Sequence, residues 1–145
     1  MEERIYAPEV RLPDGRYWIL GGQESEETSE HYIDGEFVPG PALPSDGSNS
    51  HPCAVQVTED LTFFGNRKGY LYSASANEFV ETADPMLWYA YPSMCGAVTD
   101  PADGKRYVIV AGGYDADGVF AKTQVYDVEA STYIYLRIRI QWWRG

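Results

Sequence analysis

The sequence predicts an all-β fold made of three similar four-stranded antiparallel units. Of the 145 residues, 44% are hydrophobic, and the twelve Tyr, four Trp and five Phe are residue types that favour strands. Fourteen Gly and nine Pro are spread along the chain, which indicates many short turns. A motif that recurs at a nearly constant interval indicates that one structural unit is used repeatedly.

The repeated motif is a turn, basic residues, an aromatic and aliphatic strand, and a glycine pair. Residues 14–22 and 103–113 both follow this order, and a weaker copy lies between them. In the weaker copy Asn replaces the second Gly. Asn adopts a positive φ more readily than most other residues, so the backbone geometry can be kept. The three copies end at Gly21-Gly22, Gly65-Asn66 and Gly112-Gly113, at intervals of 44 and 47 residues.

Alternating polarity and turn signals divide each repeat into four strands. The first repeat has expected strands at residues 5–12, 17–20, 31–33 and 36–38. The second has them at 53–57, 61–64, 70–73 and 79–82, and the third at 94–99, 107–111, 123–128 and from 133 onward. The whole chain is then one domain, with units at about residues 4–44, 51–84 and 93–140.

These repeats resemble the kelch repeat, whose apolar strand ends in Gly-Gly and is followed by a Tyr in the third strand and a Trp opening the fourth. The glycine pairs match, as do Tyr32, Tyr72 and Tyr126. The family's Trp position is instead occupied by Phe37, Phe79 and Tyr133. The resemblance implies a partial β-propeller of three four-stranded antiparallel kelch-like blades.

Three blades do not close a propeller, because closure takes four to eight blades and each blade packs against two neighbours. Two blade faces are therefore expected to be bare. Three explanations stay open: the chain is a fragment or short isoform, two copies associate, or atypical sequence covers the end faces.

The C-terminal segment departs from the family. Residues 134–140 alternate between aliphatic and polar side chains, which predicts a strand, and Trp142 and Trp143 follow. Two interpretations are open, an alternative or truncated C-terminus and a long outer strand.

The resemblance implies a protein-interaction module, similar to the propellers of kelch adaptors that recruit substrates to cullin ubiquitin ligases or bind actin. Partners of such propellers dock on one rim, formed here by residues 23–30, 66–69 and 114–122 and by the inter-blade loops 44–52 and 85–93. Loops on a rigid scaffold commonly carry binding. The candidate partner-binding residues are Glu24, Glu26, Glu27, Arg67, Lys68, Trp88, Tyr89, Tyr91, Asp115 and Asp117.

Two groups among these candidates have a simpler interpretation. Aromatic residues within 86–91 are typical of interface anchors, but they also suit packing between blades. The acidic loop, in which Glu30 joins the three glutamates named above, also suits a solvated turn.

The formal net charge of −11 disfavours binding to nucleic acid or an anionic membrane surface and favours a basic or neutral protein partner. No apolar run reaches the length of a membrane helix, and no secretory signal is evident, so a cytoplasmic protein is expected. Self-association through the open blade faces is the second expected contact.

No sequence pattern points to catalysis, and no cofactor or metal is expected. The chain lacks a nucleophile elbow, a phosphate-binding loop and a zinc-protease motif. His51 and Cys53 have no second ligand pair at zinc-site spacing. Cys53 and Cys95 are expected as free thiols on adjacent inner strands, too far apart to bond. The alternative is a fragment of a propeller enzyme, such as a sugar-active oxidase or isomerase.

Overall fold

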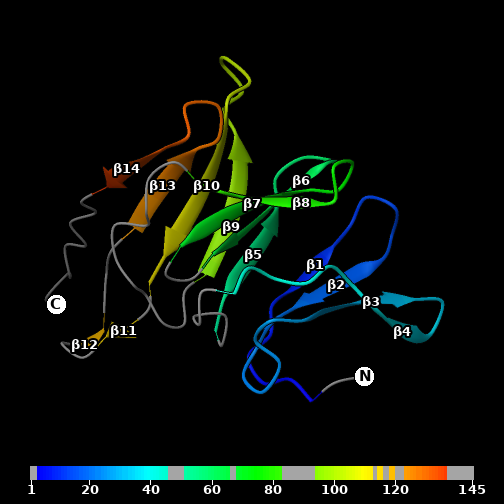
Figure 1. The fold of residues 1–145 in the computed structure, drawn as a ribbon. Coiled ribbons are helices and arrows are strands. Elements are labelled where there is room, and N and C mark those ends of the chain that lie inside the picture. Colours follow the sequence, from blue (N-terminus) through cyan, green and yellow to red (C-terminus); the bar gives the residue numbers. More distant parts are fainter. Residues whose placement is uncertain are drawn as a thin grey trace, which may run out of the picture.

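The computed structural model describes residues 3–45, 51–65, 68–82, 94–112, 114–115, 118–119 and 123–136. These residues form three separate four-stranded antiparallel sheets and contain no helix (Figure 1). The predicted all-β class and the predicted division into three four-stranded units are therefore confirmed. Within the described residues, no helix has the length and apolar character that crossing a membrane requires.

Each sheet is a meander in which every strand pairs with the next strand of the same sheet along the chain. The first sheet contains β1 (Glu9–Arg11), β2 (Tyr17–Leu20), β3 (Ser29–Ile33) and β4 (Glu36–Pro39). The second contains β5 (Cys53–Gln56), β6 (Leu61–Gly65), β7 (Gly69–Ser73) and β8 (Glu78–Glu81). The third contains β9 (Met94–Thr99), β10 (Arg106–Ala111), β13 (Thr123–Asp127) and β14 (Thr132–Leu136).

A small hairpin that the sequence analysis did not predict lies between β10 and β13. It consists of β11 (Tyr114–Asp115) and β12 (Gly118–Val119), which pair with each other alone. It falls inside the segment predicted to be a rim loop.

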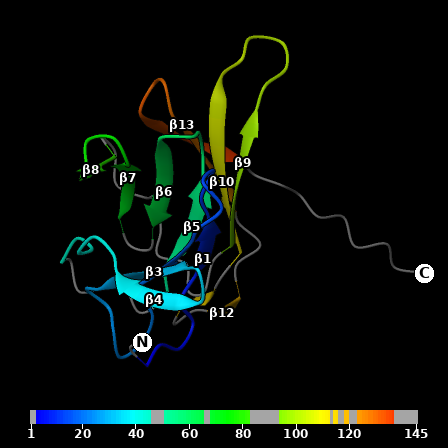
Figure 2. The same ribbon diagram turned by 90° about the vertical axis from the view of Figure 1, so that its right-hand side faces the viewer.

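The three sheets stand in chain order, with the second between the other two (Figures 1 and 2). The first strand of each sheet faces the centre of this arrangement, because β5 contacts both β1 and β9. Tight hairpins join the strands. In the β3–β4 turn both Asp34 and Gly35 have positive φ, at 50° and 92°, as both central residues of a two-residue type I′ turn do.

Two hydrophobic cores lie between the sheets. The first seam, between the first and second sheets, buries Val10, Trp18, Leu20, Leu43, Phe64, Tyr70 and Tyr72. The second seam, between the second and third sheets, buries Cys53, Phe63, Val108, Val110 and Tyr126. Because side chains alternate across a strand, Phe63 and Phe64 serve opposite seams and the second sheet is covered on both faces.

The glycine positions agree with the repeat except in the second sheet. Gly21, Gly22 and Gly112 directly follow a second strand and have positive φ. Gly65 instead remains in β6, where it is paired with Cys53 and Gly69. Asn66 and Gly113 lie outside the described residues.

The first expected strand is shorter than predicted, and the last is described only in part. The first expected strand, residues 5–12, shortens to Glu9–Arg11, since Ile5 makes only an isolated bridge to Gln23 and Tyr6 adopts a φ of 60°. At the other end β14 stops at Leu136. The rest of the predicted 134–140 strand, with Trp142 and Trp143, lies outside the described residues.

Candidate interaction surfaces

One pair of aromatic rings recurs in every sheet. A Tyr on the third strand lies directly opposite an aromatic residue on the fourth strand. The centroid distances are 5.0 Å for Tyr32–Phe37, 4.8 Å for Tyr72–Phe79 and 4.9 Å for Tyr126–Tyr133. The structure thus places the three predicted repeat tyrosines at equivalent positions and the three aromatic substitutes beside them.

In the second and third sheets, the preceding sheet covers this pair. The Trp18 ring lies 4.7 Å from Tyr72 and 6.1 Å from Phe79, and the Phe63 ring lies 6.0 Å from Tyr126. Only 8% of Tyr72 and 1% of Tyr126 stay exposed. The aromatic pair of each sheet therefore packs against the sheet before it.

Within the described residues no sheet precedes the first one, and its aromatic pair is open to solvent. Tyr17, Tyr32 and Phe37 are each 39% exposed, and with Glu9 and Ile19 they line a shallow hollow of about 520 Å³. We call Tyr17, Ile19, Tyr32 and Phe37 the aromatic face. A group of four adjacent apolar side chains is uncommon on the solvent-exposed surface of a protein.

The opposite end of the stack also presents apolar side chains. On the outer side of the third sheet, Val98 and Ile134 are 47% and 45% exposed, and Ile109 and Val125 are partly exposed. Ile109 and Val125 are direct cross-strand neighbours, and Val125 is opposite Ile134. We call these four residues the aliphatic face.

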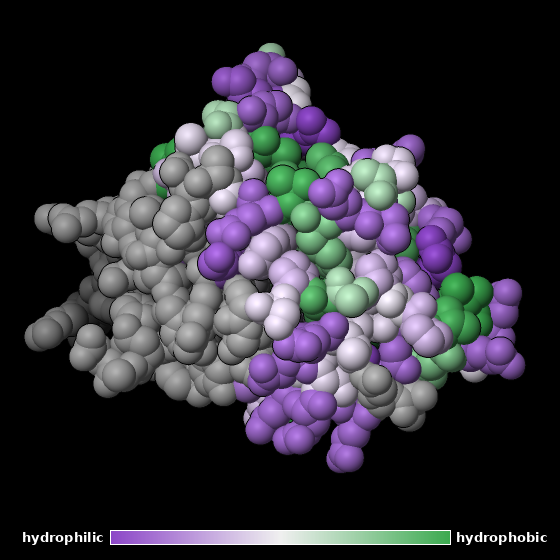
Figure 3. Space-filling view, in the orientation of Figure 1, coloured by the Kyte–Doolittle hydropathy of each residue, from purple (hydrophilic) through white to green (hydrophobic). Residues whose placement is uncertain are grey.

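The acidic loop between β2 and β3 is a third surface. Glu24 and Glu27 are exposed and Glu26 is half-buried; with Glu3 they surround a hollow of about 510 Å³. The predicted Glu30 is not part of this surface: it lies in β3, is buried, and pairs with Arg4. Hydrophilic residues dominate the lower edge of the molecule in the view of Figure 3.

A buried arginine holds the acidic loop in place. Arg4 Nη1 donates to the carbonyls of Gly21, Ser25 and Thr28 at 2.8, 3.1 and 3.0 Å, and its Nε donates to Glu30 at 3.1 Å. The side chain of Arg4 is only 6% exposed. The sequence analysis missed Arg4, because its partners lie 17 to 26 residues away and no local pattern marks it.

The loop also depends on a close approach by the N-terminal segment. A Cβ at Gly22 would come within 2.9 Å of both the Ala7 Cβ and the Ile5 carbonyl oxygen. Gly22 also has a φ of 95°, which L side chains rarely adopt. Glycine here lets residues 5–7 lie against the loop that Arg4 organises.

The other predicted rim residues are described only in part. Lys68 forms a half-exposed ion pair with Glu81 at 3.0 Å, so its charge is offset by a neighbour. The backbone of Asp115 lies in β11, and Figures 1 and 2 place the β11–β12 hairpin at the same end of the molecule as the β2–β3 loop. Arg67, Trp88, Tyr89, Tyr91 and Asp117 lie outside the described residues.

Cys53 and Cys95 are free cysteines, but they are neighbours. A hydrogen bond from Cys53, followed by burial, raises the pKa of the Cys95 thiol. The prediction of free thiols on adjacent inner strands is confirmed, and the two residues lie close because β5 and β9 pack side by side at the centre of the stack. Nearby, the His51 ring stacks on Tyr6 at 4.4 Å, and burial lowers the His51 pKa.

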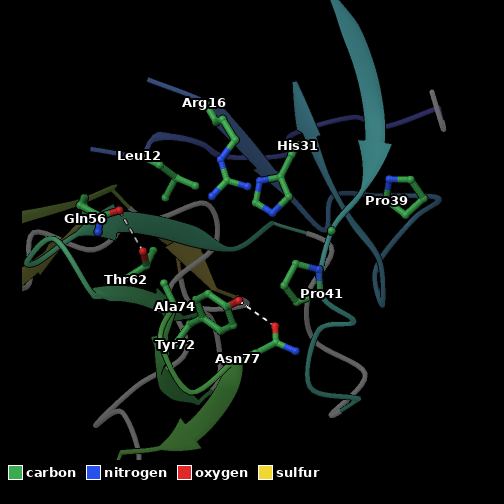
Figure 4. A pocket seen from close by; sticks show the side chains of 11 residues that line it. Leu12, Arg16, His31, Pro39, Pro41, Gln56, Thr62, Tyr72, Ala74 and Asn77 are labelled. Carbon is green, nitrogen blue, oxygen red and sulfur yellow. Dashed lines mark hydrogen bonds between the residues drawn. The ribbon is translucent and has the colours of Figure 1, made fainter. Parts of the chain in front are cut away.

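Across the described ranges, no group of three or more His, Cys, Asp or Glu side chains is arranged to hold a metal ion. A further hollow is a groove in the first seam, of about 540 Å³, which we call the seam groove (Figure 4). It receives Arg16 and His31 from the first sheet and Gln56, Tyr72 and Asn77 from the second.

Comparison with known proteins finds similarity at the level of the fold. No family model matches the chain, and no curated protein matches it. A solved structure described as "Structure of YjhT" is similar with a TM-score of 0.69 and 10% sequence identity, covering 92% of this chain and 51% of that one. The chain thus spans about half the length of the structure it matches, and identity this low bears on fold alone.

Proposed function

We propose that this chain is a segment of a kelch-like β-propeller and acts as a protein-interaction module. The repeated aromatic pair, the stacking of three meander sheets with their first strands innermost, and the fold similarity over half of a longer chain support the propeller. The observation that carries the interaction function is the aromatic face, whose equivalents in the other two sheets are covered.

The two internal seams indicate what fits the aromatic face. In the first seam Trp18, three residues before Gly21, covers the next aromatic pair. Ile109, three residues before Gly112, holds the corresponding place on the aliphatic face. If the aliphatic face of one chain packed on the aromatic face of another, Ile109 would cover an aromatic pair as Trp18 does in the first seam.

The occupant that we propose is a second copy of this chain. Each copy offers one aromatic and one aliphatic face, so two copies related by a twofold axis would form two identical new seams and leave no face open. The match to about half of a longer chain suits a ring completed by two halves.

Sedimentation of the full chain tests this association. We expect a dimer that Phe37→Glu or Ile134→Glu converts to a monomer, because either variant puts a charge into one of the new seams. Val80→Glu is the matched control, since Val80 is 56% exposed on β8 and belongs to neither face. A monomeric wild-type chain at tens of micromolar, or a dimer that all three variants leave intact, would contradict the proposal.

The acidic loop is the proposed docking site for a basic segment of another protein. Arg4 fixes the loop before binding, so little ordering entropy is lost on association. Its carboxylates favour a Lys- or Arg-bearing partner and oppose nucleic acid and anionic membranes.

A titration with a lysine-rich peptide tests this surface against the general negative charge. We expect Glu24→Gln with Glu27→Gln to weaken binding several-fold more than Glu36→Gln with Glu78→Gln, which removes the same charge from exposed positions outside the loop. Equal weakening by the two double variants would show that only net charge attracts the peptide.

The adaptor role, the cytoplasmic location and the lack of catalysis belong to this proposal. The competing function is a fragment of a propeller enzyme acting on sugars. A thermal-shift screen with divalent metals and monosaccharides separates the two, because an interaction module should gain no stability from either.

A further inference from the structure

The seam groove has the dimensions and the mixed lining of a small-molecule site. Its volume of about 540 Å³ falls within the range of roughly 300–1,000 Å³ that ligand pockets occupy. Leu12, Pro39 and Pro41 supply apolar walls, and polar side chains enter from both sheets (Figure 4). It lies inside one chain, so it is independent of the association proposed above.

The polar side chains on the second sheet are already engaged with each other. Thr62 Oγ1 donates to Gln56 Oε1 at 3.0 Å, and the Tyr72 hydroxyl donates to Asn77 Oδ1 at 3.0 Å. These bonds fix one wall of the groove and leave it little hydrogen-bonding capacity to orient a ligand.

The first sheet presents donors that lack acceptors. Arg16 bonds Asp14 through Nε, at 2.6 Å, and through its backbone nitrogen. Within the described part of the chain, nothing accepts from Arg16 Nη1 or Nη2. The guanidinium lies beside the His31 ring at the groove (Figure 4).

Two buried nitrogens of the first sheet also lack a hydrogen-bond partner among the described residues. These are His31 Nδ1 and Trp18 Nε1. Trp18 is fully buried, and a Cβ added at the groove residue Gly40 would lie 3.2 Å from its Nε1.

We propose that the seam groove binds a small organic carboxylate with an apolar body. The two Nη groups of Arg16 match the two oxygens of a carboxylate, and the His31 ring, which lines the groove beside them, donates a further hydrogen bond. The apolar body lies against Leu12, Pro39 and Pro41.

The charges around the groove favour a single negative charge over a phosphate dianion. Arg16 is the cation in the groove, and Asp14 offsets part of its charge. Burial, and then the Arg16 charge, lower the pKa of His31, so its ring is neutral near pH 7 and contributes a hydrogen bond without a second positive charge.

Benzoate is a suitable probe, with benzamide as its neutral counterpart. In two-dimensional amide NMR of the full chain, we expect benzoate to produce saturable shifts at His31, Gly40 and Asn77 and benzamide to bind at least tenfold more weakly. Equal binding of the two compounds, or shifts confined to other parts of the chain, would overturn the proposal.

Two charge-removing variants locate the site. Arg16→Gln should weaken benzoate binding about tenfold or more, because hydrogen bonds to a charged group are lost. Arg11→Gln removes the same charge from an exposed position on the other side of the first sheet and should change affinity by less than twofold. An unchanged affinity in Arg16→Gln, or an equal loss in both folded variants, contradicts the assignment.

Discussion

The first and third sheets carry the same aromatic pair in the same register but in opposite environments. Tyr126 is 1% exposed beneath Phe63, whereas Tyr32 is 39% exposed because no sheet precedes it. The local sequence sets the pair itself, since its members are cross-strand neighbours in each hairpin. Burial is set by the adjacent sheet, so the same motif is part of the core in the third sheet and lies on the surface in the first.

The largest expected effect comes from removing the covered ring. Tyr126→Ala should lower the free energy of unfolding by about 3–5 kcal/mol, because a large side chain is lost from a packed seam. Tyr32→Ala, the matched change on the open face, should cost under about 1 kcal/mol where the chain is monomeric. Urea unfolding at low protein concentration measures both, and equal costs would refute the distinction between the sheets.

Removal of Arg4 is expected to be nearly as severe. Arg4→Gln leaves the Glu30 carboxylate buried without its ion pair and frees three carbonyls, which should cost about 3 kcal/mol. The exposed Arg11→Gln should cost under about 0.5 kcal/mol. Hydrogen exchange should then show faster exchange confined to residues 21–28; an unaltered loop would contradict the role given to Arg4.

A smaller effect is expected at Gly22. Gly22→Ala should destabilise the chain by about 1–3 kcal/mol, because the new methyl group meets Ala7 and the backbone has positive φ. Gly15→Ala has a similar φ of 90° but open space around it. The difference between the two unfolding energies isolates the contact with the N-terminal segment, and no difference would mean that this contact is unimportant.

The mildest expected effect is a dependence of stability on pH. Burial lowers the folded-state pKa of His31 and His51 below 6.5, so the unfolded chain binds more protons just below that pH. Stability should therefore be full above about pH 6.5 and decrease as the pH falls through the lowered pKa values. Asp14, Asp60 and Glu129 have lowered pKa values and should add a further loss only below about pH 4.5.

His31→Gln separates the histidine contribution from that of the carboxylates. It should reduce the decrease in the urea midpoint between about pH 7.5 and 5.5 and leave the loss below about pH 4.5 in place. A decrease between about pH 7.5 and 5.5 as large in the variant as in the wild-type chain would assign that titration to other groups.

Much of the fold could be predicted from sequence because its determinants are local. The expected strands 17–20 and 94–99 coincide with β2 and β9, where alternation and turn residues are clear. The tyrosine positions followed from the repeat. The expected strand from residue 5 failed because the N-terminal segment packs on the β2–β3 loop instead of extending β1.

The surfaces were harder to predict because they depend on how the sheets stack. The sequence around Arg4 carries no signal for its contacts with a loop some twenty residues away. The sequence around Cys53 likewise carries no signal for its contact with Cys95. The seam groove joins residues from both sheets, so its lining appears only once the first seam is formed. Tyr32 was placed correctly within its strand, but only the absence of a preceding sheet makes it a surface residue.

Hydroxyl-radical labelling of the three repeat tyrosines in one sample tests the central claim most directly. Tyr32 should react much faster than Tyr72 and Tyr126 in dilute solution and become protected as the concentration rises, while the other two stay protected throughout. Similar reactivity of all three at low concentration, or a Tyr32 that stays reactive at every concentration, would contradict the account.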